Sequence, residues 1–252
     1  MNKTFWSSKE LEILQSWTGT TRELSILLNR SIHAVRLKAQ KLKVKIGQSR
    51  SINESFFEKW TSEMAYVLGF WYADGCIYDT KVNSIVSFTS KDYDILAKIK
   101  DSMSSTHPVA FTKKRSVYRL EIPRKKVVSS IEALGGQKNK TKILTFPYVP
   151  KKYVYDFIRG YWDGDGYISL KYRGYPIIGC VGTHDCMSEM QKCLGEGAFF
   201  PYREGYFLYC LRYYGEKAQE ILSLLYDNAS IYMDRKYVLA KKAQGWERKL
   251  YR

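Results

Sequence analysis

The sequence is poor in the residues that build most metal centres and disulfide frameworks. It has only three histidines, and these and its five cysteines form neither a CxxC nor an HxxxH spacing. An odd number of cysteines without a secretion signal argues against a disulfide framework, so we expect free thiols in or near the core. The spacing also excludes a zinc site with the usual ligand set.

Long apolar runs and a secretion signal are missing as well. No stretch of the chain reaches the roughly 18 apolar residues that a membrane helix needs. The opening segment, MNKTFWSSKELEIL, lacks the apolar centre and small-residue cleavage site of a signal peptide. These absences predict a cytoplasmic, intracellular protein without a membrane partner, and they leave an organelle or a phage-infected host open.

Acidic residues are outnumbered throughout the chain. The 41 Lys and Arg against 25 Asp and Glu give a formal charge of +16. Residues 1–50 hold ten Lys/Arg and three Asp/Glu, a net +7, and the other 202 residues hold 31 and 22, a net +9. This excess predicts a polyanionic partner if the basic residues lie on elements shaped to meet DNA or RNA. At 45% hydrophobic and 15% aromatic, the chain can also bury a core.

Residues 6–45 have the pattern of three short helices. Apolar residues at helical spacing and Ser or Thr caps predict helices over SSKELEILQSW, TRELSILLNR and SIHAVRLKAQKLKV. The apolar positions include Leu24, Leu27 and Leu28 in the second helix and Ile32, Val35, Leu37 and Leu42 in the third. The third helix also has a basic face, whose candidate DNA contacts are Ser31, His33, Arg36, Lys38 and Lys41.

The tryptophan spacing of this segment and RSIHAVRLKAQKL resemble Myb/SANT-like helix-turn-helix modules. The resemblance implies that the third helix enters the major groove of DNA while the other two brace it. A small helical bundle used for protein contacts is the alternative. We expect this module over residues 1–46 and a polar linker over residues 47–62.

The rest of the chain contains an internal repeat. VLGFWYADGCIY at 67–78 and IRGYWDGDGYIS at 158–169 match at an offset of 91 residues. The offset continues to VYRLEI at 117–122 and LYCLRY at 208–213. So long a period predicts two duplicated half-domains rather than a solenoid. The matched pairs are Gly69/Gly160, Trp71/Trp162, Asp74/Asp165 and Gly75/Gly166.

Each half is expected to run helix, two strands, helix, two strands, helix. Strands are predicted near 76–81, 83–89, 107–113 and 116–122, and over YISLKY, YPIIGCV, AFFPYRE and YFLYCLRYY in the second half. The predicted fold class is α/β (α+β), with two pseudo-symmetric αββαββα half-domains over residues 63–150 and 151–252. Their antiparallel sheets would be saddle-like, each with one face against helices and one polar face, and a C-terminal helix would close the second half.

The segments 63–75 and 153–166 are expected to be helices packed side by side at the centre. Small residues recur four positions apart in each, as Gly69 and Ala73 and as Gly160 and Gly164. A glycine within a helix costs about 1 kcal/mol relative to alanine, so we expect these positions to need a close approach of two backbones.

Asp74 and Asp165 are predicted to lie in the last turns of these helices, each before a C-terminal glycine. The helix dipole disfavours a carboxylate there by about 0.3–1 kcal/mol, and the two carboxylates repel each other. A divalent cation between them removes both penalties, and hard oxygen ligands suit Mg²⁺. A calcium loop is rejected, because its sixth and twelfth positions hold Ile168 and Gly174. Simple Asp-Gly turns are the weaker alternative.

At these residues both segments resemble the paired signature of the LAGLIDADG homing endonucleases, with VLGFWYADG and IRGYWDGDG in the nine positions. The resemblance covers residues 63 to 240 and the monomeric, two-motif branch. It implies that Asp74 and Asp165 are metal ligands, that the sheets lie in the DNA major groove, and that Mg²⁺-dependent cleavage leaves short 3′ overhangs. The sixth position, often acidic in the family, is Tyr72 in one copy and Asp163 in the other.

The family also uses basic residues near the metal, which no motif identifies. The repeat register suggests Lys126 and Lys217 as catalytic candidates, and Lys142 and Lys236 form a second pair. Hairpin turns suggest phosphate contacts. These candidates are Lys113, Lys114, Arg115, Lys171 and Arg173.

We therefore expect a monomeric, metal-dependent, site-specific endonuclease that cuts both strands of double-stranded DNA. A catalytically silent DNA-binding regulator on the same fold is one alternative, since a fold does not fix a function. An intron RNA maturase is the other, because the family includes both activities. Strand cleavage or assisted splicing would distinguish them.

Overall fold

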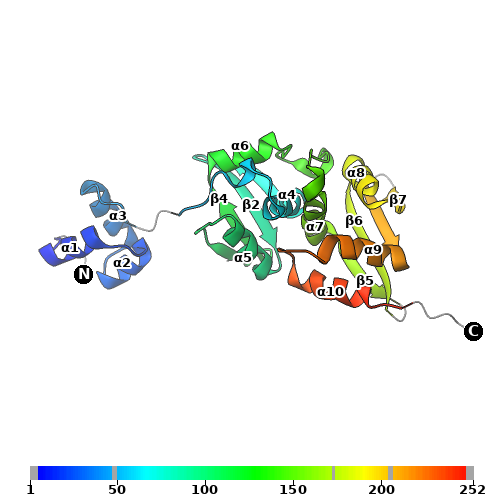
Figure 1. The fold of residues 1–252 in the computed structure, drawn as a ribbon. Coiled ribbons are helices and arrows are strands. Elements are labelled where there is room, and N and C mark those ends of the chain that lie inside the picture. Colours follow the sequence, from blue (N-terminus) through cyan, green and yellow to red (C-terminus); the bar gives the residue numbers. More distant parts are fainter. Residues whose placement is uncertain (1–4, 47–49, 172–173, 204–206, 248–252) are drawn as a thin grey trace, which may run out of the picture. The chain divides into compact units, whose positions relative to one another are not determined.

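The computed structural model of the protein describes residues 5–46, 50–171, 174–203 and 207–247. The chain divides into two compact units, residues 1–50 and 51–252, and each is described by itself. Figure 1 shows a three-helix first unit and a larger unit with two sheets.

The first unit is built from α1 (Ser8–Ser16), α2 (Thr21–Leu27) and α3 (Ile32–Lys41). Two capping boxes start the first two helices, because Ser7 and Thr20 exchange hydrogen bonds with Glu10 and Glu23. The core consists of Leu14, Leu24, Leu28, Val35 and Ala39.

Three leucine and isoleucine positions of this unit differ from the expected inward stripe. Leu27, Ile32 and Leu37 are 57%, 38% and 52% exposed. Leu37 is two residues from both Val35 and Ala39, which puts it on the opposite side of α3. Leu27 ends α2, and its neighbour Leu28 takes the inner position.

The first half of the larger unit has the expected order of elements. They are α4 (Ser62–Asp74), β1 (Gly75–Asp79), β2 (Ser84–Ser90), α5 (Tyr93–Ser102), β3 (Val109–Thr112), β4 (Val117–Ile122) and α6 (Lys125–Ala133). The strands form an antiparallel sheet in the order β1-β2-β4-β3. Short 3₁₀ turns follow at η2 (Lys140–Lys142) and η3 (Lys151–Tyr153).

The second half repeats this order and adds one helix. Its elements are α7 (Val154–Asp165), β5 (Tyr167–Lys171), β6 (Tyr175–Thr183), α8 (His184–Leu194), β7 (Ala198–Pro201), β8 (Leu208–Tyr214), α9 (Gly215–Tyr226) and α10 (Asp234–Gln244). The antiparallel sheet order, β5-β6-β8-β7, matches that of the first half. The predicted pair of αββαββα half-domains with a final helix is thus confirmed.

The expected linker over 47–62 is shorter in the structure. Residues from Ser51 onward belong to the larger unit, and Phe56 and Phe57, in the 3₁₀ turn η1 (Phe56–Glu58), are buried in its core. The Asn53 N–H donates to the Met103 carbonyl at 2.9 Å. Phe56 and Phe57, together with the partly buried Ile52 and Trp60, anchor this segment to the core of the larger unit.

Helices α4 and α7 lie side by side between the two sheets, and their contact is the most extensive between any two described elements (Figure 1). A Cβ built on Gly69 would lie 2.0 Å from the Phe157 carbonyl oxygen, and one on Gly160 would lie 2.0 Å from that of Tyr66. A Cβ on Gly164 would lie 2.3 Å from the Ala73 Cβ. Only small residues permit this approach of two helix backbones.

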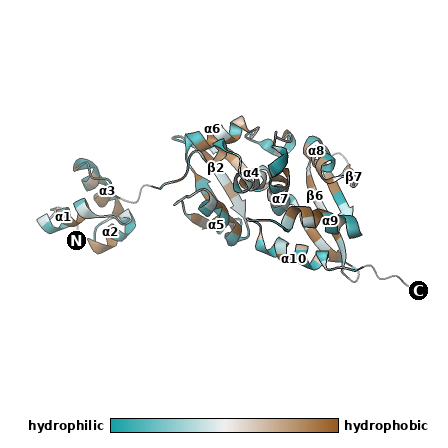
Figure 2. Ribbon diagram, in the orientation of Figure 1, coloured by the Kyte–Doolittle hydropathy of each residue, from teal (hydrophilic) through white to brown (hydrophobic). Residues whose placement is uncertain are grey.

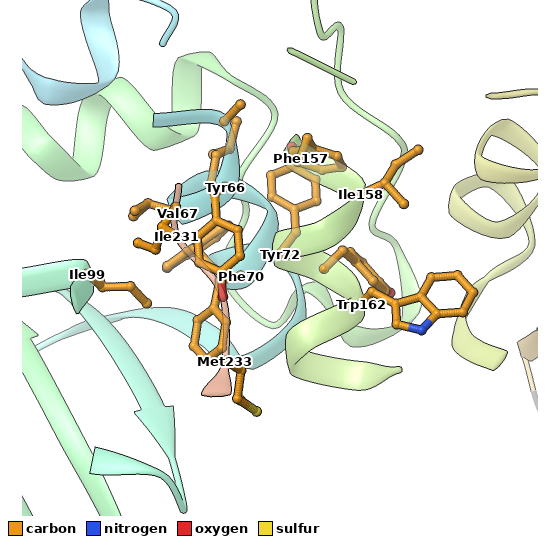
Figure 3. Close-up of a cluster of buried hydrophobic side chains, with 14 of the residues drawn as sticks. Tyr66, Val67, Phe70, Tyr72, Ile99, Phe157, Ile158, Trp162, Ile231 and Met233 are labelled. Carbon is orange, nitrogen blue, oxygen red and sulfur yellow. The ribbon is translucent and has the colours of Figure 1, made fainter. Parts of the chain in front are cut away.

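Large side chains fill the space on both sides of this helix pair. Figure 3 shows Tyr66 and Phe70 of α4 beside Ile231 and Met233, and Tyr72 close to Phe157 of α7. The Tyr72 and Phe157 ring centroids are 5.2 Å apart in an edge-on arrangement. This shared core fixes the ends of both helices relative to each other.

Each sheet is covered by helices on one face, α5 and α6 on the first sheet and α8 and α9 on the second. Strand alternation places the buried Leu120 and Ile122, and likewise Leu211 and Tyr213, toward the helices. The residues between them, Glu121 and Arg212, therefore point to the open face of each sheet.

Candidate active site at the ends of the central helices

Asp74 and Asp165 are the last residues of α4 and α7. Gly75 and Gly166 follow as C-caps, each donating its N–H to a tryptophan carbonyl of its helix. Their backbone is extended, with φ of −96° and −84°, rather than in the left-handed conformation common at glycines that end helices. Glycine is required there because a Cβ would lie 2.2 Å from the Trp71 ring or 2.5 Å from the Trp162 ring.

The two carboxylates share one electrostatic environment. Both are in contact with solvent, but the protein packed around them displaces enough water to raise the pKa of Asp74. Burial, and then the negative charge of Asp74, raises the pKa of Asp165 to about 6. Two negative charges are therefore unfavourable at this site, and a bound cation would stabilise them.

Two buried lysines lie beneath the helix ends. Lys140, in η2, donates its Nζ to the carbonyl oxygens of Tyr72 and Ala73, the latter at 3.0 Å. Lys236, in α10, donates to the carbonyls of Trp162 at 2.6 Å, Asp163 at 2.7 Å and Gly166 at 2.5 Å. These carbonyls lie at the C-terminal ends of the two helices, where a cation is favourable, and that of Trp162 also accepts the Gly166 N–H.

The charges of these lysines act across the two halves. After burial, the Lys236 charge is the largest influence on the pKa of Asp74, and it lowers that pKa. Lys140 is the first cation acting on the pKa of Asp165, which it lowers. Each lysine thus caps the helix of its own half but acts most on the carboxylate of the other half.

The structure brings together only part of the predicted set of lysines. Lys236 lies at the site, but Lys126 pairs with Glu58 at 2.8 Å and Lys217 pairs with Glu220 at 2.9 Å. Lys142 is exposed and lies over the Phe207 ring, 4.4 Å from its centroid. The lysine that corresponds to Lys236 in the first half is Lys140, two residues before Lys142, and the sequence alone did not identify it.

Tyr72 and Asp163, at the sixth signature positions, are buried and make hydrogen bonds that hold neighbouring segments in place. The Asp163 carboxylate accepts hydrogen bonds from the Tyr66 hydroxyl at 2.7 Å, the Tyr226 hydroxyl at 2.6 Å and the Met233 N–H at 2.8 Å. Burial raises the pKa of Asp163 while these donors oppose the rise. Tyr72, in the equivalent position, donates to the Leu134 carbonyl at 2.7 Å. Asp163 therefore holds the start of α10, the helix that carries Lys236.

The donor set at the helix ends fits a hard divalent cation. Asp74 and Asp165 offer carboxylate oxygens, and no group of three or more His, Cys, Asp or Glu side chains in the described ranges offers an alternative metal site. Two protein ligands leave positions for water and phosphate, as Mg²⁺ sites commonly do. A cavity of about 300 Å³ lined by Lys140, Asp165 and Tyr161 lies beside them.

Most of the predicted DNA contacts among the described residues are exposed, and Lys38 is half-buried. Ser31 caps α3 and accepts a hydrogen bond from the Ala34 N–H, and Lys38 approaches the Trp6 ring to 5.8 Å. Other candidates are exposed on α3 or at the hairpin turns, namely His33, Arg36, Lys41, Lys113, Lys114, Arg115 and Lys171. Arg173 lies outside the described residues.

Two further expectations concern cysteines and membranes. All five cysteines are free thiols; three are buried and Cys76 is exposed on β1. Among the helices of the described ranges, none is both long and apolar enough to cross a membrane.

Comparison with known proteins gives the fold. No protein-family model matches the chain, and no curated protein matches it. Meganuclease I-SmaMI bound to uncleaveable DNA is 11% identical with a TM-score of 0.52, over 71% of this chain and 88% of that chain. The LAGLIDADG homing endonuclease I-LtrWI bound to target DNA is 10% identical with a TM-score of 0.50, over 75% and 89%. Variants of the homing endonuclease I-DmoI are 15% identical with a TM-score of 0.52, over 75% and 98%. The chain therefore has the single-chain LAGLIDADG homing endonuclease fold, as its two DG segments predict.

Proposed function

We propose that the protein is a site-specific, metal-dependent endonuclease of the homing type that hydrolyses both strands of a long DNA target. The observation that carries this proposal is the pair of carboxylates, Asp74 and Asp165, at converging helix ends above two buried lysines. The net charge of +16 supports a nucleic-acid partner. The I-SmaMI and I-LtrWI structures of the same fold contain DNA.

Asp74 and Asp165 would hold the metal ion, which we propose to be Mg²⁺. Bound there, it would supply a water of lowered pKa and charge stabilisation at the phosphate. The positive charges of the two lysines favour the ionised carboxylates, because they oppose the rise in pKa that burial causes at both. Their backbone hydrogen bonds fix each ammonium where it can also oppose charge that develops on phosphate oxygens.

Two observations bear on the alternatives. A binding protein without chemistry gains nothing from two neighbouring carboxylates whose pKa values are raised by burial and, at Asp165, also by the charge of Asp74. One chain supplies both carboxylates and both lysines, so a second copy is not needed to complete the site. An RNA maturase remains distinguishable by its substrate.

The DNA interface is proposed to extend beyond the site. The exposed basic residues of α3 and of the two hairpin turns would contact phosphates, and the first unit would add affinity through its effective concentration along one DNA molecule. A chain without residues 1–50 should bind more weakly, with a flatter salt dependence.

The direct test incubates a pooled DNA library, or the DNA that flanks the gene, with the full chain in Mg²⁺ or in EDTA. The Asp165→Asn variant runs beside the wild type. Discrete double-strand cuts that need Mg²⁺ and disappear in the variant are the expected result. Selective binding without cutting would favour the regulator, and neither cutting nor DNA binding would favour RNA.

A further inference from the structure

The two sheets differ in charge at one pair of equivalent positions. On the first sheet, the row that begins directly after Gly75 runs Cys76, Ser87, Glu121. On the second sheet, the row that begins directly after Gly166 runs Tyr167, Gly179, Arg212. Both rows start at the residue next to a C-cap glycine, so Glu121 and Arg212 lie at matching distances from the carboxylate pair along their sheets.

Arg212 is held in place by aromatic side chains. Its Nε donates to the Tyr167 hydroxyl at 2.5 Å, and its guanidinium lies 4.9 Å from the Phe200 ring centroid. The Tyr167 ring covers Gly179, where a Cβ would lie 2.6 Å from it. Nη1 makes a long contact of 3.5 Å with the Tyr214 hydroxyl, and Nη2 has no acceptor among the described residues. The two terminal nitrogens of the Arg212 guanidinium, Nη1 and Nη2, are therefore held in position to donate to two acceptors.

Glu121 is held in a corresponding way but offers the opposite chemistry. Its Oε1 accepts hydrogen bonds from the Tyr78 hydroxyl at 2.8 Å and from Arg119 Nη1 at 3.1 Å. Its Oε2 has no donor among the residues that the structure describes. The side chain is 42% exposed, so the second oxygen can accept from a partner above the sheet.

We propose that Glu121 and Arg212 read bases at two target positions equally distant from the centre of the site, with opposite preferences. The proposal rests on the proposed function, because it needs DNA to lie over the open sheet faces. A guanidinium fork recognises guanine O6 and N7 in the major groove, whereas a carboxylate accepts from the cytosine amino group. The two half-sites therefore break palindromic symmetry at this pair of positions.

The test selects DNA by binding rather than by cleavage. A randomised duplex library is bound in Ca²⁺ or Mg²⁺ by the full-length wild type and by the Arg212→Gln and Glu121→Gln variants, and bound DNA is sequenced. Glutamine favours adenine, so Arg212→Gln should shift one position from guanine to adenine by about 5- to 150-fold. Glu121→Gln should shift only the mirrored position, from cytosine to adenine. Lys171→Gln, at the end of β5, is the matched control and should weaken binding without changing any base preference.

The outcomes separate this inference from the nuclease proposal. Base shifts at mirrored positions support it, even if the selected DNA is bound but not cut, a result that would remove only the nuclease activity. A palindromic preference at the two positions, or unchanged preferences in both variants, would overturn it while leaving cleavage intact. Failure to bind any duplex DNA would overturn both.

Discussion

The two half-domains place a lysine beneath the end of their central helix by different structural routes. In the first half Lys140 comes from the 3₁₀ turn η2, which follows Asn139 in a left-handed conformation. In the second half Lys236 comes from α10, a helix with hydrophilic residues along most of its length (Figure 2). The site is thus symmetric in its chemistry, while the elements that support it are not.

The sixth signature position shows the same relation. Tyr72 and Asp163 occupy equivalent positions in the two halves. Tyr72 connects α4 to the segment before Lys140, and Asp163 connects α7 to the start of α10, the helix that carries Lys236. Tyr72 does so with one donated hydrogen bond, and Asp163 does so with three accepted ones. Substitutions at equivalent positions of the two halves test how far this symmetry extends.

The largest effect is expected where the halves are most alike. Asp74→Asn and Asp165→Asn should each reduce the cleavage rate by a factor of about 1,000 or more, because each removes one anionic ligand from a shared cation. Single-turnover cleavage of a selected target measures this. A variant that retains the wild-type rate would show that its half contributes no ligand.

The sixth position should show the clearest difference between halves in stability. Asp163→Ala leaves two buried tyrosine hydroxyls and one N–H without an acceptor, and should lower the free energy of unfolding by about 3–5 kcal/mol. Tyr72→Phe removes one donor and should cost about 1–2 kcal/mol. Denaturant titrations compare them, and equal costs would contradict the asymmetry.

The helix contact should be equally sensitive from both sides. Gly69→Ala and Gly160→Ala each place a Cβ 2.0 Å from a carbonyl oxygen, which must force the helices apart at a cost of about 2–3 kcal/mol. Gly245→Ala is the control, because its Cβ would meet only ordinary contacts at 3.7 Å or more. A tolerated Gly69→Ala beside a damaging Gly160→Ala would show that the contact is not symmetric.

The smallest effect concerns pH. The pKa of Asp165, raised to about 6, means that ionising this group in the folded state costs stability, a cost that develops as pH rises from about 4 to 6. At pH 8 without divalent ions, the free energy of unfolding of Asp165→Asn should therefore exceed that of wild type by about 1 kcal/mol, a small gain because solvent screens the group, and thermal unfolding measures it. The difference should shrink at pH 5, and Mg²⁺ should stabilise only the wild type. A larger difference at pH 5 than at pH 8 would contradict the sign.

Most of the fold could be predicted from the sequence, because the two copies of the repeat match best at positions where close packing permits few residue types. The offset of 91 residues aligns the glycines, tryptophans and aspartates of the central helices and the strands that follow them. These positions are fixed by backbone contact and by alternation in a sheet, which tolerate few residue types. The packing of residues 51–61 against the larger unit and the exposure of Leu37 could not be predicted from the sequence. Both depend on neighbouring side chains that only the folded chain brings together.

The lysines of the site could not be predicted in the same way. Lys140 and Lys236 are 96 residues apart, so the repeat register selects Lys126 and Lys217 instead. A lysine that caps helix carbonyls can reach them from any nearby segment, and this freedom leaves no fixed spacing in the sequence. Asp163 also carried an ambiguous signal, because the buried hydroxyls of Tyr66 and Tyr226 that satisfy it come from distant helices.

Strand-resolved cleavage by Lys140→Met and Lys236→Met is the most direct test of the two buried lysines, with Lys142→Met as the control beside Lys140. A selected target labelled differently on its two strands is followed in Mg²⁺. Each site variant should slow one strand by about 100- to 1,000-fold, with opposite strands affected, because the two lysines lie beneath the ends of different central helices. The control should cut both strands at the wild-type rate. If both site variants slow the same strand, or neither slows any, the two halves do not supply equivalent lysines to one cleavage centre.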